Sequence, residues 1–154
     1  MYVKHVDFAF PPKILTKFGN CHKKDEHGRL TVNPNVFYPT HGGTFKPAMT
    51  MCSDCPVWKE CAEWAIKRNE FGCWGGTTED DRKDIRKHRE GGNSTPEPWP
   101  EGLKHGHMKK SVRAHHRLGE LPCEICHKAW TSHYPNLIIN LKSKNSETRN
   151  EHDD

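Results

Sequence analysis

The sequence feature that most constrains the fold is a set of four cysteines, Cys21, Cys52, Cys55 and Cys61. The last three form a C-x2-C-x5-C pattern, and Cys21 lies well upstream of them. Thiolates from one distant and three clustered positions can surround a compact metal centre, and this arrangement suits an iron–sulfur cluster. Tetrahedral zinc accepts the same four sulfurs, so spacing alone leaves both cofactors open.

The composition explains why such a chain needs a metal. Only 32% of its 154 residues are hydrophobic, and its mean hydropathy is -0.97. Small chains with little apolar surface to bury usually gain stability from disulfides or metal ions. Met1–Phe10 lacks the apolar run of a secretory signal, and the seven cysteines are odd in number, which disfavours a secreted disulfide framework. We therefore expect a small metal-dependent protein of the reducing cytoplasm, without a membrane-spanning segment.

A helix is predicted directly after the clustered cysteines. It should run from about Pro56 to Glu70 and stop at Gly72, with Ser53 or Asp54 as its N-cap and Pro56 in its first turn.

The helical spacing of this segment sorts its side chains. Trp58 and Trp64 share one stripe and are expected in the core. Cys61 lies on the same stripe and should face inward, whereas Cys52 and Cys55 should lie on the loop that leads into the helix.

A tight turn and a second helix are expected next. Residues 72–76 are too rich in glycine for a helix, so they should form a turn that holds Trp74 outward. Thr78 should cap a helix over residues 79–90, whose acidic first turn and basic last turn match the helix dipole. Because Ile85 is its only apolar residue, this helix should be mostly solvated or lie against a charged partner.

Together these motifs resemble the WhiB-like transcription regulators of actinobacteria and their phages. The resemblance covers residues 19–90 and rests on Cys21, Phe37-Tyr38-Pro39, Cys52-x2-Cys55-Pro56-Val57-x3-Cys61, Trp74-Gly75-Gly76-Thr77-Thr78-Glu79 and the basic helix over residues 82–89. Cys73 is a departure, because the family usually carries an aliphatic residue there. It is interpreted as a small buried hydrophobic residue, the alternative being a reactive fifth thiol.

The resemblance implies a 4Fe-4S cluster held by Cys21, Cys52, Cys55 and Cys61 in a small, mostly α-helical fold. It also implies that a monomer binds the C-terminal, promoter-reading region of the primary sigma factor of RNA polymerase and contacts promoter DNA. The sigma-binding residues carried over are Trp74, Gly75, Gly76, Phe37 and Tyr38. The family further implies a regulator rather than an enzyme, with a response to redox state or nitric oxide. The alternative for Trp74 is a core residue that closes a small metal domain.

A second Cys/His segment, residues 102–135, lies beyond a Pro/Gly-rich linker at residues 91–101. Here Cys123-x2-Cys126, His115 and Gly119-Glu120-x-Pro122 are similar to a short element of actinobacterial and phage proteins. Zinc is the predicted ion, and His105 or His107 is the candidate fourth ligand, although neither spacing fits cleanly. The alternative is a free C-x2-C on a solvated segment. Thioredoxin-like catalysis would need a βαβ context that the sequence lacks.

The same segment is basic, since six lysines and arginines face only two glutamates between residues 102 and 128. We expect it to be the main DNA contact, with residues 82–89 as a weaker candidate; a merely solvated surface is the alternative. The predicted DNA-binding residues are Lys109, Lys110, Arg113, Arg117, Arg82 and Arg86.

Two terminal regions and three other functions complete the predictions. Residues 1–18 should form a loose arm, and residues 136–154 a disordered polar tail. The competing functions are a zinc-only nucleic-acid-binding module, a thiol–disulfide reductase acting after cluster loss, and an electron carrier.

Overall fold

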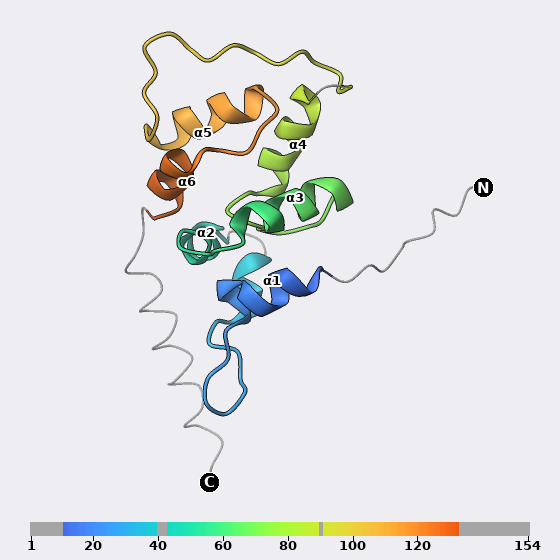
Figure 1. The fold of residues 1–154 in the computed structure, drawn as a ribbon, viewed down its shortest axis with the longest axis vertical. Helices are drawn as coiled ribbons and strands as arrows, with labels where there is room; N and C mark the ends of the chain where they lie inside the picture. Colours follow the sequence, from blue (N-terminus) through green and yellow to red (C-terminus); the bar gives the residue numbers. More distant parts are fainter. Residues whose placement is uncertain (1–10, 40–42, 90, 133–154) are drawn as a thin grey trace, which may run out of the picture.

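The computed structural model describes residues 11–39, 43–89 and 91–132 (Figure 1). The helices of this part are α1 (Lys13–Phe18), α2 (Lys46–Cys52), α3 (Trp58–Arg68), α4 (Glu79–His88), α5 (Met108–Arg117), α6 (Glu124–Thr131) and two 3-10 helices, η1 (Asn20–His22) and η2 (Pro34–Phe37). The described residues contain no strand, only the isolated bridges Lys24–Leu30 and Trp74–Thr77. The predicted small, mostly α-helical fold is therefore confirmed.

The expected N-terminal arm is partly helical. Pro12 precedes α1, and Leu15 on this helix is only 4% exposed. Proline restricts the backbone just before the helix, and the buried leucine holds the helix against the protein. The prediction of a loose arm is wrong for residues 13–18; residues 1–10 and the predicted tail at residues 136–154 lie outside the described residues.

The predicted helix after the cysteines is α3, but both of its ends differ from the prediction. The preceding residues 46–52 already form α2, so Ser53 and Asp54 lie in the turn that leaves it and neither caps α3. Cys52 is consequently the last residue of α2 rather than a loop residue. At the other end, Asn69 adopts the left-handed conformation (φ 55°), which stops the helix before Gly72.

The core residues of α3 also differ in one position. Trp58 is buried as predicted, together with Ala62, Ala65 and Ile66. Trp64, predicted to be a core residue, is only half-buried, and the guanidinium of Arg68 lies 5.1 Å from the centre of its ring.

The start of α4 confirms the predicted cap. The hydroxyl of Thr78 accepts a hydrogen bond from the Asp81 N–H, and the Asp81 carboxylate accepts one from the Thr78 N–H. Of the two alternatives predicted for this helix, the mostly solvated one is wrong, because Arg82, Ile85 and His88 form a buried face. The helix packs against α3 and α5, so its polar side chains find partners inside the protein.

The C-terminal helices pack against the rest of the chain. In Figure 1, α5 and α6 lie beside each other, with α5 next to α4 and α6 next to α2, and each of these pairs is in contact. The segment between α4 and α5 also returns to the protein, since the Glu97 N–H donates to the Arg117 carbonyl and the Ser94 N–H donates to that of Lys87. No helix in the described ranges has the length and apolar character needed to cross a bilayer.

Candidate metal centres and interaction surface

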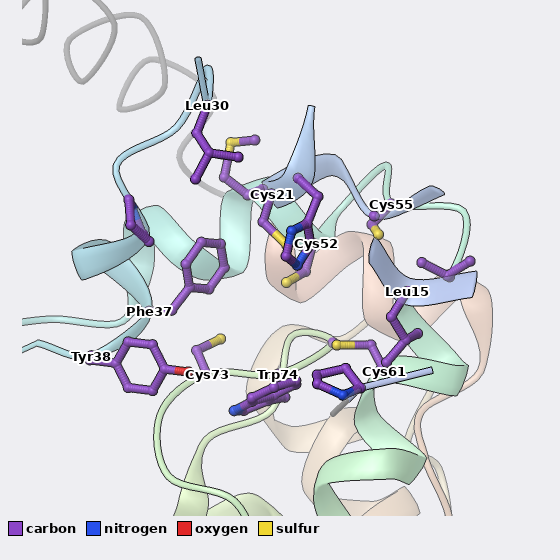
Figure 2. A pocket seen from close by; sticks show the side chains of 17 residues that line it. Leu15, Cys21, Leu30, Phe37, Tyr38, Cys52, Cys55, Cys61, Cys73 and Trp74 are labelled. Atoms are coloured by element: carbon purple, nitrogen blue, oxygen red, sulfur yellow. The ribbon is translucent and has the colours of Figure 1, made fainter. Parts of the chain in front are cut away.

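Five cysteines line one cavity of about 220 Å³, the four predicted ligands and Cys73, and this cavity is far larger than a single water needs. Cys21 comes from η1, Cys52 from the end of α2, Cys55 from the following turn and Cys61 from α3. Figure 2 shows these side chains and Trp74 around the same space, with Leu15, Phe37 and Tyr38 on its apolar walls. The structure thus brings together the predicted thiols from four separate segments.

Three thiols of this cavity, those of Cys21, Cys52 and Cys61, are hard to ionise without a positive charge. Burial, together with the neighbouring thiols of Cys52 and Cys55, raises the pKa of Cys21 to about 11. The pKa of Cys61 is raised chiefly by burial, and that of Cys52 first by a hydrogen bond with Cys73 and then by burial. Thiolates are the metal-binding form of cysteine, and a bound cation deprotonates its thiol ligands. The donor set therefore fits a metal centre.

Cys73 lies beside this cavity but is 3% exposed, and it packs with Ala48 and Met49. Cys73 is therefore buried as expected, but its thiol also lines the cavity and makes a hydrogen bond with Cys52.

The turn beside the cavity consists of residues 74–77 and is called the Trp74 turn below. Trp74 and Thr77 each donate their backbone N–H to the other's carbonyl at 3.0 Å. Gly75 and Gly76 have φ values of 56° and 73°, a left-handed pair that glycine adopts without strain. A side chain at Gly75 would also collide with the Trp58 carbonyl and Ala62, because the turn lies directly on α3.

Arg82 holds the Trp74 turn in place through hydrogen bonds to backbone carbonyls. Its side chain is fully buried, and its two terminal nitrogens donate to the carbonyls of Thr77, Gly72 and Glu70. Predicted as a DNA contact, Arg82 instead has no exposed surface for a phosphate, which corrects that assignment. Arg86 is half-buried and donates to the Ile66 carbonyl and the Asn69 side chain.

Aromatic side chains are exposed next to this turn. Tyr38 is 51% exposed and Phe71 is 77% exposed, and Trp74 is partly exposed while its indole N–H donates to the Phe71 carbonyl. The Cys73 N–H donates to the Phe37 carbonyl at 2.9 Å, which ties η2 to the turn. We call Phe37, Tyr38, Phe71 and Trp74 the aromatic surface. Phe71 was not identified from the sequence, where nothing separates it from a core phenylalanine.

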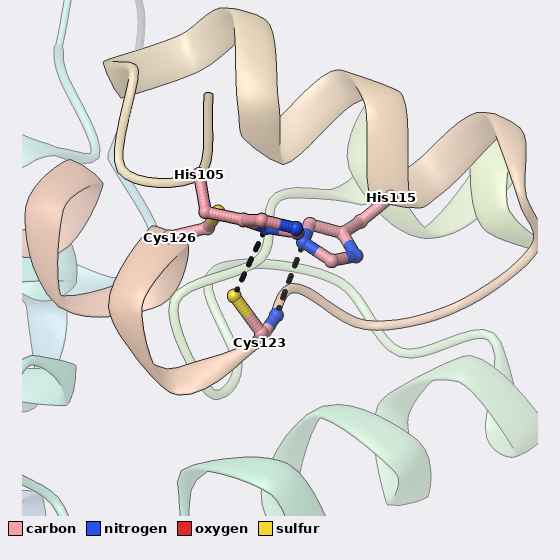
Figure 3. Close-up of side chains that lie close together, drawn as sticks. All are labelled: His105, His115, Cys123 and Cys126. Atoms are coloured by element: carbon pink, nitrogen blue, oxygen red, sulfur yellow. Dashed lines mark hydrogen bonds between the residues drawn. The ribbon is translucent and has the colours of Figure 1, made fainter. Parts of the chain in front are cut away.

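A second donor group combines His105, His115, Cys123 and Cys126, whose ligand atoms all lie within 4.8 Å of one another (Figure 3). Three of these were predicted, and the structure selects His105 rather than His107 as the fourth. Among the described residues this group alone gathers donors closely enough to hold a single ion.

The four predicted DNA-binding residues of α5 lie on one face of the helix and are all exposed: Lys109, Lys110, Arg113 and Arg117. Their spacings of three, four and seven residues explain the common face. The Lys109 ammonium lies 5.7 Å from the ring centre of Trp130. Arg117 Nε lies 3.9 Å from a carboxylate oxygen of Glu97. The face is cationic and open to an anionic partner.

The comparisons with known proteins match the segment that carries Cys21, Cys52, Cys55 and Cys61. The family described as "Transcription factor WhiB" matches residues 17–85. Transcriptional regulator WhiB2 of Bifidobacterium longum is 42% identical over 61 residues, which cover 38% of this chain and 62% of that protein. Transcriptional regulator WhiB of Streptomyces coelicolor is 39% identical over 57 residues, covering 36% and 66%. Transcriptional regulator WhiB1 of Mycobacterium tuberculosis is 33% identical over 63 residues, covering 36% and 73%.

The chain belongs to the WhiB family of transcription factors. The match spans somewhat less than two thirds of the Bifidobacterium and Streptomyces relatives. The family match ends at residue 85, before α5, so the second donor group and the cationic face lie outside the part shared with the family.

Proposed function

We propose that this chain is a transcriptional regulator that carries a 4Fe-4S cluster on Cys21, Cys52, Cys55 and Cys61 and binds the primary sigma factor beside that cluster. The observation that carries the proposal is the meeting of four thiols at one cavity, with the Trp74 turn and η2 on its wall. The cavity of about 220 Å³ between them leaves room for a multi-atom cluster, whose irons each take one thiolate, and this favours the cluster over the zinc-only alternative.

When bound, the cluster would supply a redox-responsive centre that joins η1, α2 and α3. The residues around the cluster site shield it from water and position the Trp74 turn. Leu15, Phe37 and Tyr38 form an apolar wall that restricts access of water, and Arg82 holds the Trp74 turn against the cavity. The raised pKa values of Cys21 and Cys61 make these two thiols poor nucleophiles for the reductase alternative, because thiol exchange needs an accessible thiolate.

Metal analysis tests the cofactor directly. Protein prepared without oxygen should contain about four irons and four sulfides per chain, as the composition of such a cluster requires. The Cys55→Ser variant should lose them, whereas Cys123→Ser should keep them. Stoichiometric zinc in place of iron, lost on changing Cys55, would refute the proposed cofactor.

Sigma binding is assigned to the aromatic surface. A partly exposed tryptophan on a rigid turn, flanked by exposed aromatics, has the character of an interface hot spot. Trp74→Ala should weaken binding to the C-terminal region of the host's primary sigma factor by roughly thirtyfold, about 2 kcal/mol, without changing the iron content. Ile125→Ala is the matched control, because Ile125 is also exposed but lies on α6. Unchanged affinity in Trp74→Ala would contradict the assignment.

Promoter DNA is assigned to the cationic face of α5. Each phosphate contact releases counterions, so DNA affinity should fall as salt rises, with a slope set by the number of contacts. Replacing Lys109, Lys110, Arg113 and Arg117 by alanine should flatten that slope and leave sigma binding unchanged. An unchanged salt slope in this variant would exclude α5 as the DNA contact.

A further inference from the structure

We infer that His105, His115, Cys123 and Cys126 bind a single tetrahedral zinc ion at a second metal site. We also infer that this ion, by holding α5 and α6 together, stabilises the Trp74 turn. The inference concerns residues beyond the family match and does not depend on the nature of the first centre.

The donor spacing matches tetrahedral coordination. His105 Nδ1 lies 3.5 Å from the Sγ atoms of both Cys123 and Cys126 (Figure 3). Zinc–nitrogen and zinc–sulfur bonds of about 2.0–2.3 Å place tetrahedral ligand atoms roughly 3.3–3.8 Å apart. Two thiols and two imidazoles are also a donor set that zinc prefers over magnesium or calcium. All four donor atoms lie within 4.8 Å of one another, so one ion can bind among them once the widest pair closes by about 1 Å.

The surroundings orient the donors for an ion. His115 Nδ1 lies 2.8 Å from the Glu120 carboxylate, and its Nε2 accepts a long hydrogen bond of 3.4 Å from the Cys123 backbone N–H. A carboxylate on the far nitrogen of a ligating histidine fixes its tautomer and raises its basicity. Trp99 stacks on His105 with ring centres 4.4 Å apart, and the Gly106 N–H donates to Cys126 Sγ. These contacts hold three of the four ligands in place.

The helix that carries Cys126 also contacts the first site. The next residue, His127, stacks on Trp58 of α3 with ring centres 3.6 Å apart and planes 6° apart. Its Nε2–H donates to the Cys52 carbonyl at 2.9 Å.

The Trp74 turn lies directly against the same helix. A methyl group added at Gly76 would stand 2.9 Å from His127 Cε1 and from Thr131 Cγ2. The position of α6 therefore limits how far the turn can move. Since Cys123 and Cys126 bracket the first turn of α6, an ion bound to them fixes this helix against the turn.

A second contact attaches the other end of the pair. Gly119, at the end of α5, lies so close to the His88 carbonyl that an added methyl group would stand 2.7 Å from it. Arg89 donates from Nε to the Gly119 carbonyl and from both terminal nitrogens to Glu63 on α3. The α5–α6 pair is thus attached to the family domain at two separate places.

Metal content of the full chain tests the site. Zinc should be present at about one per chain, in addition to any iron. It should be lost in Cys123→Ser/Cys126→Ser and kept in the matched control His107→Gln, which changes a histidine outside the donor group. Glu120→Gln, a milder change, should weaken zinc affinity about 10–100-fold against a competing chelator.

The outcomes separate this inference from the proposed function. Iron without zinc in the wild-type chain overturns the second site alone. Zinc that is kept in Cys123→Ser/Cys126→Ser but lost on changing Cys55 overturns the second site and the iron–sulfur proposal together.

Hydrogen exchange tests the stabilising role. The amides of Trp74 and Thr77 are bonded to each other, so a peptide covering residues 71–78 reports opening of the turn. Exchange there should be roughly tenfold faster in Cys123→Ser/Cys126→Ser, and also in His127→Ala with zinc retained, given what a buried stack and hydrogen bond contribute. Exchange equal to wild type in the zinc-free double variant would overturn the stabilising role.

Discussion

Gly76→Ala tests the packing of α6 on the Trp74 turn, and the chain offers a matched control. Gly76 and Gly28 share a φ of 73°, so alanine at either position meets the same backbone strain, about 1–2 kcal/mol. Only Gly76 has neighbours, because nothing lies within 4 Å of a methyl group built at Gly28. The difference between the two variants therefore measures the contact itself.

The expected magnitudes follow from the two contributions. Overpacking in a close contact typically costs about 1–3 kcal/mol, so Gly76→Ala should destabilise the protein by about 2–5 kcal/mol in total. At about 4 °C per kcal/mol for a domain of this size, Gly28→Ala should lower the Tm by about 4–8 °C and Gly76→Ala by about 8–20 °C. Thermal unfolding without oxygen, followed by near-ultraviolet circular dichroism, provides the measurement.

A double-variant cycle identifies the neighbour. His127→Ala removes one of the two groups that the new methyl would meet. In that background, the additional cost of Gly76→Ala should shrink by about 1 kcal/mol or more. Equal Tm shifts for Gly76→Ala and Gly28→Ala would refute the packing of α6 on the turn.

Three further changes have distinct expected results. Arg82→Ala should lower the free energy of unfolding, measured by chemical denaturation, by about 3 kcal/mol or more, because three backbone carbonyls lose a buried charged donor. The control Lys83→Ala, at an exposed neighbouring position, should change it by no more than about 0.5 kcal/mol. Cys73→Val should keep the full iron content and cost less than about 1.5 kcal/mol, since Cys73 packs with Ala48 and Met49 in the core; loss of iron would make it a ligand. Phe71→Ala should leave the Tm nearly unchanged but weaken sigma binding in a direct titration, and wild-type affinity would remove Phe71 from the aromatic surface.

Local rules made part of this structure predictable. The capping box at Thr78 and Asp81 depends on residues three apart, and the glycines of the Trp74 turn are needed for their positive φ. The helix after Cys55 was also predicted, although its start was placed too early because α2 uses the residues that looked like caps. Such features are encoded within a few residues of where they act.

Other features depend on contacts between distant segments. Arg82 reads as a surface cation, and only the fold supplies the carbonyls of Glu70, Gly72 and Thr77 that make its burial favourable. His105 was one of two candidates, and the choice depends on where Trp99 and Cys126 lie in three dimensions. Nothing beside His127 in the sequence indicates that it stacks on Trp58, far earlier in the chain.

The bond between His127 and Cys52 joins residues 75 positions apart, which sets an order of events during synthesis. Ribosomes add about 5–20 residues per second, so Cys52 is made about 4–15 seconds before His127. During that interval Trp58 has no partner from α6, and the thiols of Cys52, Cys55 and Cys61 are already present in the nascent chain. A cofactor delivered in this window meets its thiols before α6 exists to cover Trp58.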